Sequence, residues 1–456
     1  MFKHRFLTGT ALAALAFVTY GCKSVSDPNI YKYYPVTVSG YKGSKDISVA
    51  YTGQIARHVL HDSLKKLAGQ GDGYPNDALK SIMTSYYAKT TKNREILAPT
   101  SKGVFKIKQT NIDKISKKKN LSGKTYKGTI TGMPRNMNGP ELVNFWIGKA
   151  SSAKKGVDTV NGYNYPQLIS KFIMGAVSYN QAVDNYLDEK LGADKKPNDK
   201  PYKKGAHYTG KEHSWDEAFG YFGAPAHTMT LTAKQVYNIA KRKKEGFAAA
   251  DYDEDGVVDL KTEMTFGPAY YAAGFDKGGK TNYLHTIMSA YIEGRKVITA
   301  AGGKKLTNAQ RNKIKGSALV IAKNWERVLA EATFKYAGSV YKDMGKVETI
   351  IEAKGNASKA MNAYIKHWGE LKGFSLALQT GNKKLGATGT KLNRLVGFGP
   401  LMPDLSQVTN IDRKGNYVRG KGVSWKDYRQ QMADIQKLMI KKFGVKARAK
   451  DITNLY

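Results

Sequence analysis

The sequence predicts an all-α protein, made of internally duplicated helical bundles that are joined by long basic loops. Apolar residues recur at helical spacing over most of the 456 residues. Prolines and N-cap residues stand where these apolar stripes begin, as Pro166 does before a stripe that extends to Leu191. A short motif that contains tryptophan occurs twice, which indicates an internal repeat.

The helices are expected between breaks that are rich in glycine, proline or lysine. The expected ranges are 53–68, 76–87, 140–147, 166–191, 212–223, 230–244, 282–300, 307–344, 357–379 and 424–439. The lysine-rich stretch 88–135 is expected to be a long basic excursion, and 381–423 a loop-rich tail. His58 and His61 lie on the first of these helices, where we expect them at the surface or at its boundary.

The repeated motif reads Trp-x-Glu-x-x-Gly-aromatic and suggests two similar halves. It begins at Trp215 and again at Trp368, each time after a long helix that is rich in tyrosine and alanine. We therefore divide the chain into a signal peptide (1–21), a tether (22–50), a first helical half (51–250), a calcium-type loop (251–263), a second helical half (264–400) and a C-terminal tail with its helix (401–456).

The N-terminus has the features of a bacterial lipoprotein signal. Lys3 and Arg5 precede an apolar stretch, 6–18, that is too short to span a bilayer. A small residue then stands before Cys22, the single cysteine of the chain. We expect Cys22 to be lipidated and the protein to be anchored in the cell envelope, at the outer membrane. The alternative is an ordinary secretory signal with a spare cysteine.

The charge of the chain predicts an electropositive surface. There are 74 Lys and Arg residues against 37 Asp and Glu, which gives a formal net charge of +37. Such a surface attracts polyanions. No zinc-finger spacing, aromatic RNA-binding signature or phosphate-binding Gly-Lys-Ser/Thr loop is present, so nucleic acid is not the expected partner. Anionic lipid headgroups or anionic glycans are the preferred partners.

Histidines and carboxylates around the repeated motif form a candidate transition-metal site. Spacings of three or four residues on a helix place imidazole and carboxylate on one face. Helical bundles build metal sites from such residues on facing helices, and this donor set suits Fe or Zn. The candidate ligands are His213, Asp216, Glu217, His367, Glu370 and Glu212. The alternative is a set of buried hydrogen-bonded pairs that hold the helices together.

A second candidate metal site is a loop of the EF-hand type that begins at Asp251. Acidic residues stand at its first, third, fifth and ninth positions, and Gly256 stands at the sixth, where the loop turns sharply. The candidate Ca²⁺ ligands are Asp251, Asp253, Asp255, Val257 through its carbonyl, Asp259 and Glu263. Glu263 is one residue beyond the usual twelfth position, which Thr262 occupies. The alternative is a solvated acidic turn.

The lipoprotein signal and the runs that start at Glu212 and His367 resemble an uncharacterised family of bacterial envelope lipoproteins. The chain is also distantly similar to imelysin-like proteins, which are helical, internally duplicated and marked by a Gly-x-His-x-x-Glu motif. His367 and Glu370 match the second part of that motif, whereas Ile365 stands in place of its glycine. This resemblance implies a link to iron uptake.

Together these features predict a lipid-anchored envelope protein that binds a metal ion, with a role in iron acquisition. Two alternatives stay open: a metal-dependent, peptidase-like hydrolase, and a structural envelope protein that binds anionic glycan or lipid. The chain has no Gly-x-Ser-x-Gly motif, no His-Glu-x-x-His motif and no catalytic cysteine, so a binding protein is favoured over an enzyme.

Overall fold

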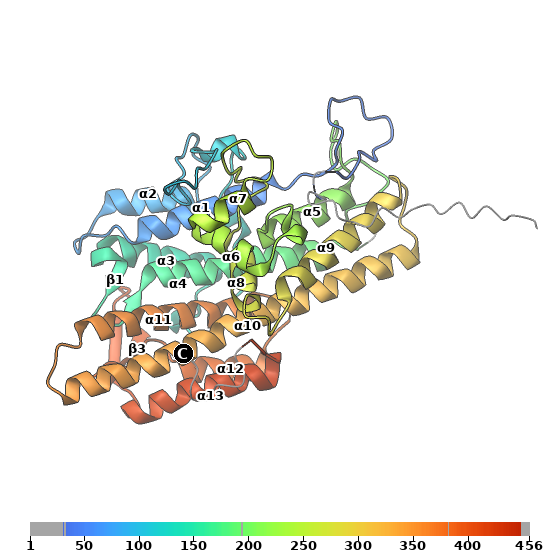
Figure 1. Ribbon diagram of the computed structural model, residues 1–456. Coiled ribbons are helices and arrows are strands. Elements are labelled where there is room, and N and C mark those ends of the chain that lie inside the picture. Colours follow the sequence, from blue (N-terminus) through green and yellow to red (C-terminus); the bar gives the residue numbers. More distant parts are fainter. Residues whose placement is uncertain (1–30, 32, 193–194, 382, 448–456) are drawn as a thin grey trace, which may run out of the picture.

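The computed structural model confirms the all-α class (Figure 1). It describes residues 31, 33–192, 195–381 and 383–447. The predicted signal peptide and the lipidation site at Cys22 lie outside this part of the chain. Within it, no helix has the length and apolar character that crossing a membrane requires.

The helices follow the predicted order, with two small antiparallel hairpins between them. The α-helices are α1 (Thr52–Ala68), α2 (Asp77–Tyr87), α3 (Gly139–Ser152), α4 (Tyr165–Ile173), α5 (Gly210–Phe222), α6 (Ala233–Lys241), α7 (Phe247–Ala250), α8 (Gly267–Asp276), α9 (Tyr283–Ala300), α10 (Asn308–Glu352), α11 (Ser358–Ala377), α12 (Gly386–Val396) and α13 (Trp425–Phe443). The strands are β1 (Val157–Asp158), β2 (Tyr163–Asn164), β3 (Ser406–Ile411) and β4 (Tyr417–Lys421).

Local sequence explains where several helices begin. Helices α3, α5, α6 and α10 begin with capping boxes. In a capping box the side chains of the N-cap residue and of the third helical residue each bond the other residue's backbone amide. Proline occupies the first turn of α3, α4 and α8. After α4 the helix continues with π-helical segments at Met174–Tyr179 and Gln181–Glu189.

Helices from both predicted halves contribute to one hydrophobic core, whose members range from Tyr31 to Ala447. Helix α10 has 45 residues, roughly 68 Å of helix, and runs along most of the molecule (Figure 1). It packs against α9, α11 and α13, while α4 packs between α1 and α11.

The two copies of the repeated motif lie on α5 and α11. Trp215 lies on α5, which packs against the π-helical segment Gln181–Glu189, and Trp368 lies on α11, which packs against α10. Each motif helix therefore packs against the long helix before it. The indole partners differ, since Trp215 donates to the Tyr291 carbonyl and Trp368 to the Tyr428 hydroxyl.

Two aromatic residues at the described end of the segment predicted as a tether, Tyr31 and Tyr34, pack into the protein, whereas most of residues 39–46 are exposed. Tyr31 is 1 % exposed and stacks on Phe219 with ring centroids 3.7 Å apart. The Tyr34 hydroxyl donates to the Ile292 carbonyl, 3.2 Å away. These two aromatic residues thus extend the core beside α5 and α9.

His58 and His61 are both buried, at 3 % exposure, which corrects the expectation of surface positions. Nε2 of His58 lies 3.1 Å from the Gly220 carbonyl, and Nε2 of His61 lies 3.0 Å from the Ser170 hydroxyl. Burial lowers the pKa of His58 to about 4. Burial also lowers the pKa of His61 well below its ordinary value, and the charge of His58 adds to this effect.

These histidines should destabilise the protein in acid. The unfolded chain binds protons at an ordinary histidine pKa, whereas the folded chain does not, so the free energy of unfolding falls as pH drops from about 6.5 to 4. Between these two pH values, the free energy of unfolding should fall by about 3 kcal/mol less in His58→Gln than in the wild type. Urea unfolding at a series of pH values measures the difference, and parallel curves for the two proteins would contradict it.

Candidate metal centre

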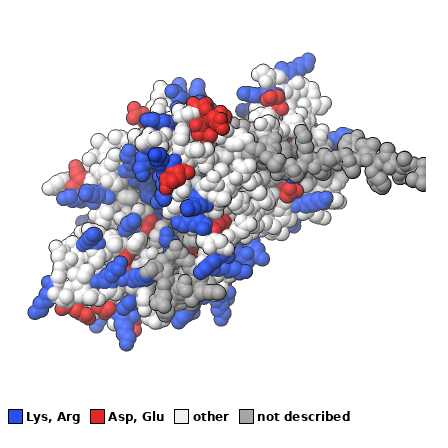
Figure 2. All heavy atoms as spheres, viewed as in Figure 1, with Lys and Arg blue, Asp and Glu red and all other residues white. Residues whose placement is uncertain are grey.

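The acidic loop directly follows the short helix α7 and leads into α8. Its tip is exposed, and Figure 2 shows acidic side chains gathered there. Glu254 and Gly256 both have left-handed backbone conformations, with φ of 57° and 81°. Glycine adopts this conformation without steric cost, which explains its place at the sharp turn of the loop.

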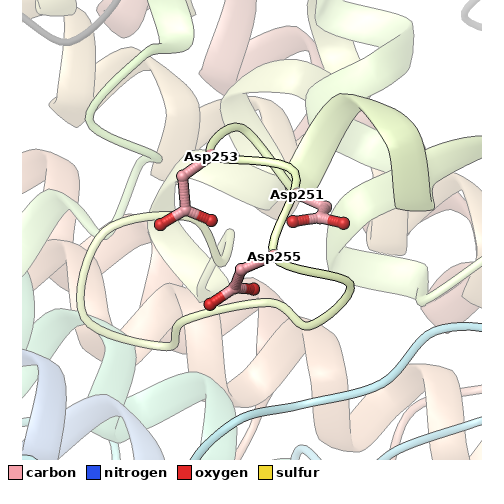
Figure 3. A group of neighbouring side chains, drawn as sticks. All are labelled: Asp251, Asp253 and Asp255. Atoms are coloured by element: carbon pink, nitrogen blue, oxygen red, sulfur yellow. The ribbon is translucent and has the colours of Figure 1, made fainter.

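Three of the predicted calcium ligands come together inside this loop. Oxygen atoms of Asp251, Asp253 and Asp255 all lie within 4.8 Å of one another, and the three side chains lie within the curve of the loop (Figure 3). Among the described residues, this is the group of three or more His, Cys, Asp or Glu side chains whose geometry suits a metal ion. Clustered carboxylate oxygens are the donor set that Ca²⁺ prefers.

Asp251 is the member of the group that points most directly to a ligand. Its side chain is only 9 % exposed. Oδ2 accepts a hydrogen bond from the Gly256 amide at 3.1 Å, but Oδ1 is buried and has no hydrogen-bond partner within the described chain. A buried carboxylate oxygen without a partner is costly, and a bound cation would remove that cost.

Asp259 and Glu263, the other two predicted carboxylate ligands, accept hydrogen bonds from backbone amides. Glu263 accepts the amides of Tyr252 at 3.2 Å and Asp259 at 2.7 Å, and so ties the two ends of the loop together. Asp259 Oδ1 accepts the Lys261 amide at 2.8 Å. The position of Glu263, one residue late in the motif, accounts for this role. The Val257 amide donates to Asp255 Oδ1 at 3.0 Å.

The loop is joined to the irregular segment 95–112. Ile107 and Val258 form a parallel bridge, with amide-to-carbonyl distances of 2.8 and 3.0 Å on its two sides. The Gln109 side chain donates to Asp259 at 2.7 Å and accepts the Leu260 amide at 2.8 Å. Val258 and Ile107 are buried, so the acidic loop holds this part of the basic excursion against the core.

Lys108 would compete with a bound cation for the acidic group. Its Nζ lies 2.6 Å from Asp255 Oδ2, and both side chains are partly exposed. The hydrogen bond from this ammonium to Asp255 raises the pKa of Lys108. Lys108 and Gln109 could not be found from sequence, because they lie almost 150 residues before the loop in a stretch with weak periodicity.

The residues of the predicted transition-metal site lie at four different helix interfaces. His213 and Glu217 are a pair on α5, with Nε2 and Oε2 3.6 Å apart. Glu217 also accepts a hydrogen bond from Gln54 of α1 at 2.7 Å. The His213 ring stacks on Tyr208 with centroids 4.5 Å apart, and burial lowers the pKa of His213.

On α11 the predicted histidine–carboxylate pair is replaced by two separate contacts. His367 Nδ1 lies 2.5 Å from Asp343 of α10. Glu370 instead faces α4, where its Oε1 lies 3.8 Å from Lys171 Nζ. Helix α11 packs between α10 and α4, so a spacing of three residues directs these two side chains toward different neighbours.

Glu212 and Asp216 are engaged by a buried arginine. Arg295 of α9 is 0 % exposed; its Nε lies 2.9 Å from Asp216 and its Nη1 3.3 Å from Glu212. The guanidinium bonds both carboxylates, and its single positive charge offsets one of their two negative charges. These two predicted metal ligands therefore hold α5 to α9 in this structure.

Comparison with known proteins found a family match for part of the chain. Residues 76–259 match the model of a family described as a domain of unknown function (DUF4856). The matched range begins just before α2 and ends at Asp259, so it includes α5 and most of the acidic loop. Similarity to an uncharacterised family is thereby confirmed over this range. Comparisons with curated proteins and with solved structures gave no match.

Proposed function

We propose that the chain is a calcium-binding protein of the cell envelope, anchored by a lipid on Cys22, in which Ca²⁺ stabilises the loop 251–259. The observation that supports this most strongly is the buried, unpartnered Oδ1 of Asp251 beside two further carboxylates. A role in iron acquisition is not part of the proposal, because the histidines and carboxylates predicted to hold iron lie at separate interfaces.

The proposed role of the ion is structural. Three carboxylates are fewer than the six to eight oxygens that Ca²⁺ takes, so water and a carbonyl would complete its shell. Such a site binds with a Kd of about 10⁻⁴ to 10⁻³ M, in the range of extracellular calcium modules. Because the loop bonds to Ile107 and Gln109, the ion would also stabilise the segment 95–112.

Isothermal titration of the full chain with CaCl₂ tests the proposal. We expect one saturable site, which Asp253→Asn weakens by about tenfold through the loss of a charged ligand. Lys108→Met should instead tighten binding by up to about fivefold, because it frees Asp255 from a partly exposed ion pair.

Glu254→Gln is the matched control, because it removes a carboxylate from the same loop without touching the acidic group. Its affinity should stay within about twofold of the wild type, since an exposed charge is screened by salt. Equal loss of affinity in Asp253→Asn and Glu254→Gln, or no saturable site in the wild type, would refute the proposal.

A further inference from the structure

A second feature of the protein is a cavity with a basic lining, to which no residue of the acidic loop contributes. It has a volume of about 480 Å³ and lies between α1, α4, α6 and α8. Its charged lining residues are Asp62, Lys65, Lys66, Lys171, Lys241 and Arg242. Figure 2 shows basic side chains gathered beside α1 and α6 on the viewed face. Five basic side chains against one acidic side chain make the charged lining predominantly basic.

Lys171 is the least exposed of these cations. Its residue is 5 % exposed, and its ionic contact with Glu370 at 3.8 Å is longer than a hydrogen bond. Burial lowers the pKa of Lys171 well below its ordinary value, and the positive charge of Lys65 lowers it further. A buried ammonium beside a second lysine is unfavourable, and an anion between them would relieve both the burial and the repulsion.

The rest of the lining suits an organic ligand. Tyr270, Tyr271 and Phe266 supply aromatic surface, and the Thr265 hydroxyl is buried with no hydrogen-bond partner in the described chain. Thr265 is 2 % exposed. A cavity of this volume exceeds the needs of a free phosphate ion and falls within the range of small-molecule sites, about 300–1,000 Å³. Apolar walls with a few convergent polar groups are typical of such sites.

We propose that this cavity binds a phosphorylated small molecule. Lys65, Lys171 and Arg242 would contact the phosphate, since ammonium and guanidinium groups are the side chains that recognise phosphate in proteins. Tyr270 and Tyr271 would pack against the organic part of the ligand. The same chemistry is offered by a soluble phosphate ester and by the headgroup of an anionic lipid. This site shares no residue with the proposed calcium site, so either can fail without the other.

Binding is measured on the full chain with two probes. The first is glycerol 3-phosphate, titrated by calorimetry, and the second is a set of vesicles containing phosphatidylglycerol, measured by co-sedimentation. Lys171→Met and Lys65→Met should each weaken binding by about tenfold, the loss expected for one charge-assisted contact. Lys65 is partly exposed, so its variant folds even if Lys171→Met does not.

Lys346→Met is the control, because Lys346 is an exposed residue of α10 outside the cavity and its loss changes the net charge equally. If the cavity variants lose glycerol 3-phosphate binding and Lys346→Met keeps it, the ligand is a soluble phosphate ester. If the cavity variants lose vesicle binding and Lys346→Met keeps it, the ligand is a lipid headgroup. If neither probe distinguishes the cavity variants from Lys346→Met, attraction to the basic surface is diffuse and the proposal is wrong.

Discussion

Replacing Arg295 by methionine is expected to lower the free energy of unfolding by about 3–5 kcal/mol. The guanidinium is fully buried and bonds two equally buried carboxylates, Glu212 and Asp216. It also donates to the Ser48 and Thr299 hydroxyls, both at 2.5 Å. Its loss leaves two buried carboxylates without a counter-ion, and the resulting penalty exceeds the net stabilisation by the pairs themselves.

Chemical denaturation of both proteins measures this effect, with Lys296→Met as the neighbouring control. Lys296 forms a half-exposed ion pair with Glu293 at 3.2 Å, so its loss should cost less than about 1 kcal/mol. If Arg295→Met lowered the free energy of unfolding as little as Lys296→Met does, the structural role assigned to Glu212 and Asp216 would be contradicted. Added zinc or iron should not restore the stability of the Arg295 variant.

Replacing Gly294 by alanine should destabilise the protein by about 3 kcal/mol or more, because it overpacks the core. A Cβ atom at Gly294 would lie 2.0 Å from the ring of Trp215. That indole is 1 % exposed and is held by its bond to the Tyr291 carbonyl at 2.8 Å.

Gly316→Ala is the matched control, since Gly316 also lies within a helix but has open space around its Cα. There alanine should stabilise the protein by about 0.5–1 kcal/mol through its higher helix propensity. Thermal and urea unfolding of the two variants should therefore shift in opposite directions. Similar shifts for both would show that the contact between α5 and α9 is not tightly packed.

The helices that could be predicted from sequence are those with a clear contrast between apolar and polar faces. Helix α13 shows this contrast, as does the stripe after Pro166. Helix α8 was missed because it is buried on most of its surface and is rich in alanine and tyrosine, so it has little periodicity. Helix α12 contains Gly386 and Gly389, which lower helix propensity. The β3–β4 hairpin lies in the stretch predicted as a loop-rich tail.

The acidic group of the candidate site could be predicted because it is local: three aspartates at alternate positions before a glycine converge within one loop. The histidine–carboxylate site could not, since helical spacing defines a shared face but not the neighbour that the face contacts. Glu217 turns to α1 and Glu370 to α4. Long-range partners such as Lys108 and Arg295 leave no local signal, because they depend on how the helices pack.

The most direct test of calcium binding is a crystal structure of the full chain grown with CaCl₂, with anomalous data to locate the ion. We predict one anomalous peak inside the loop, about 2.3–2.6 Å from oxygen atoms of Asp251, Asp253 and Asp255. The Asp251 Oδ1 atom should be among the ligands, and Lys108 should have moved away from Asp255. A loop without a peak, in which Lys108 still bonds Asp255, would contradict the account.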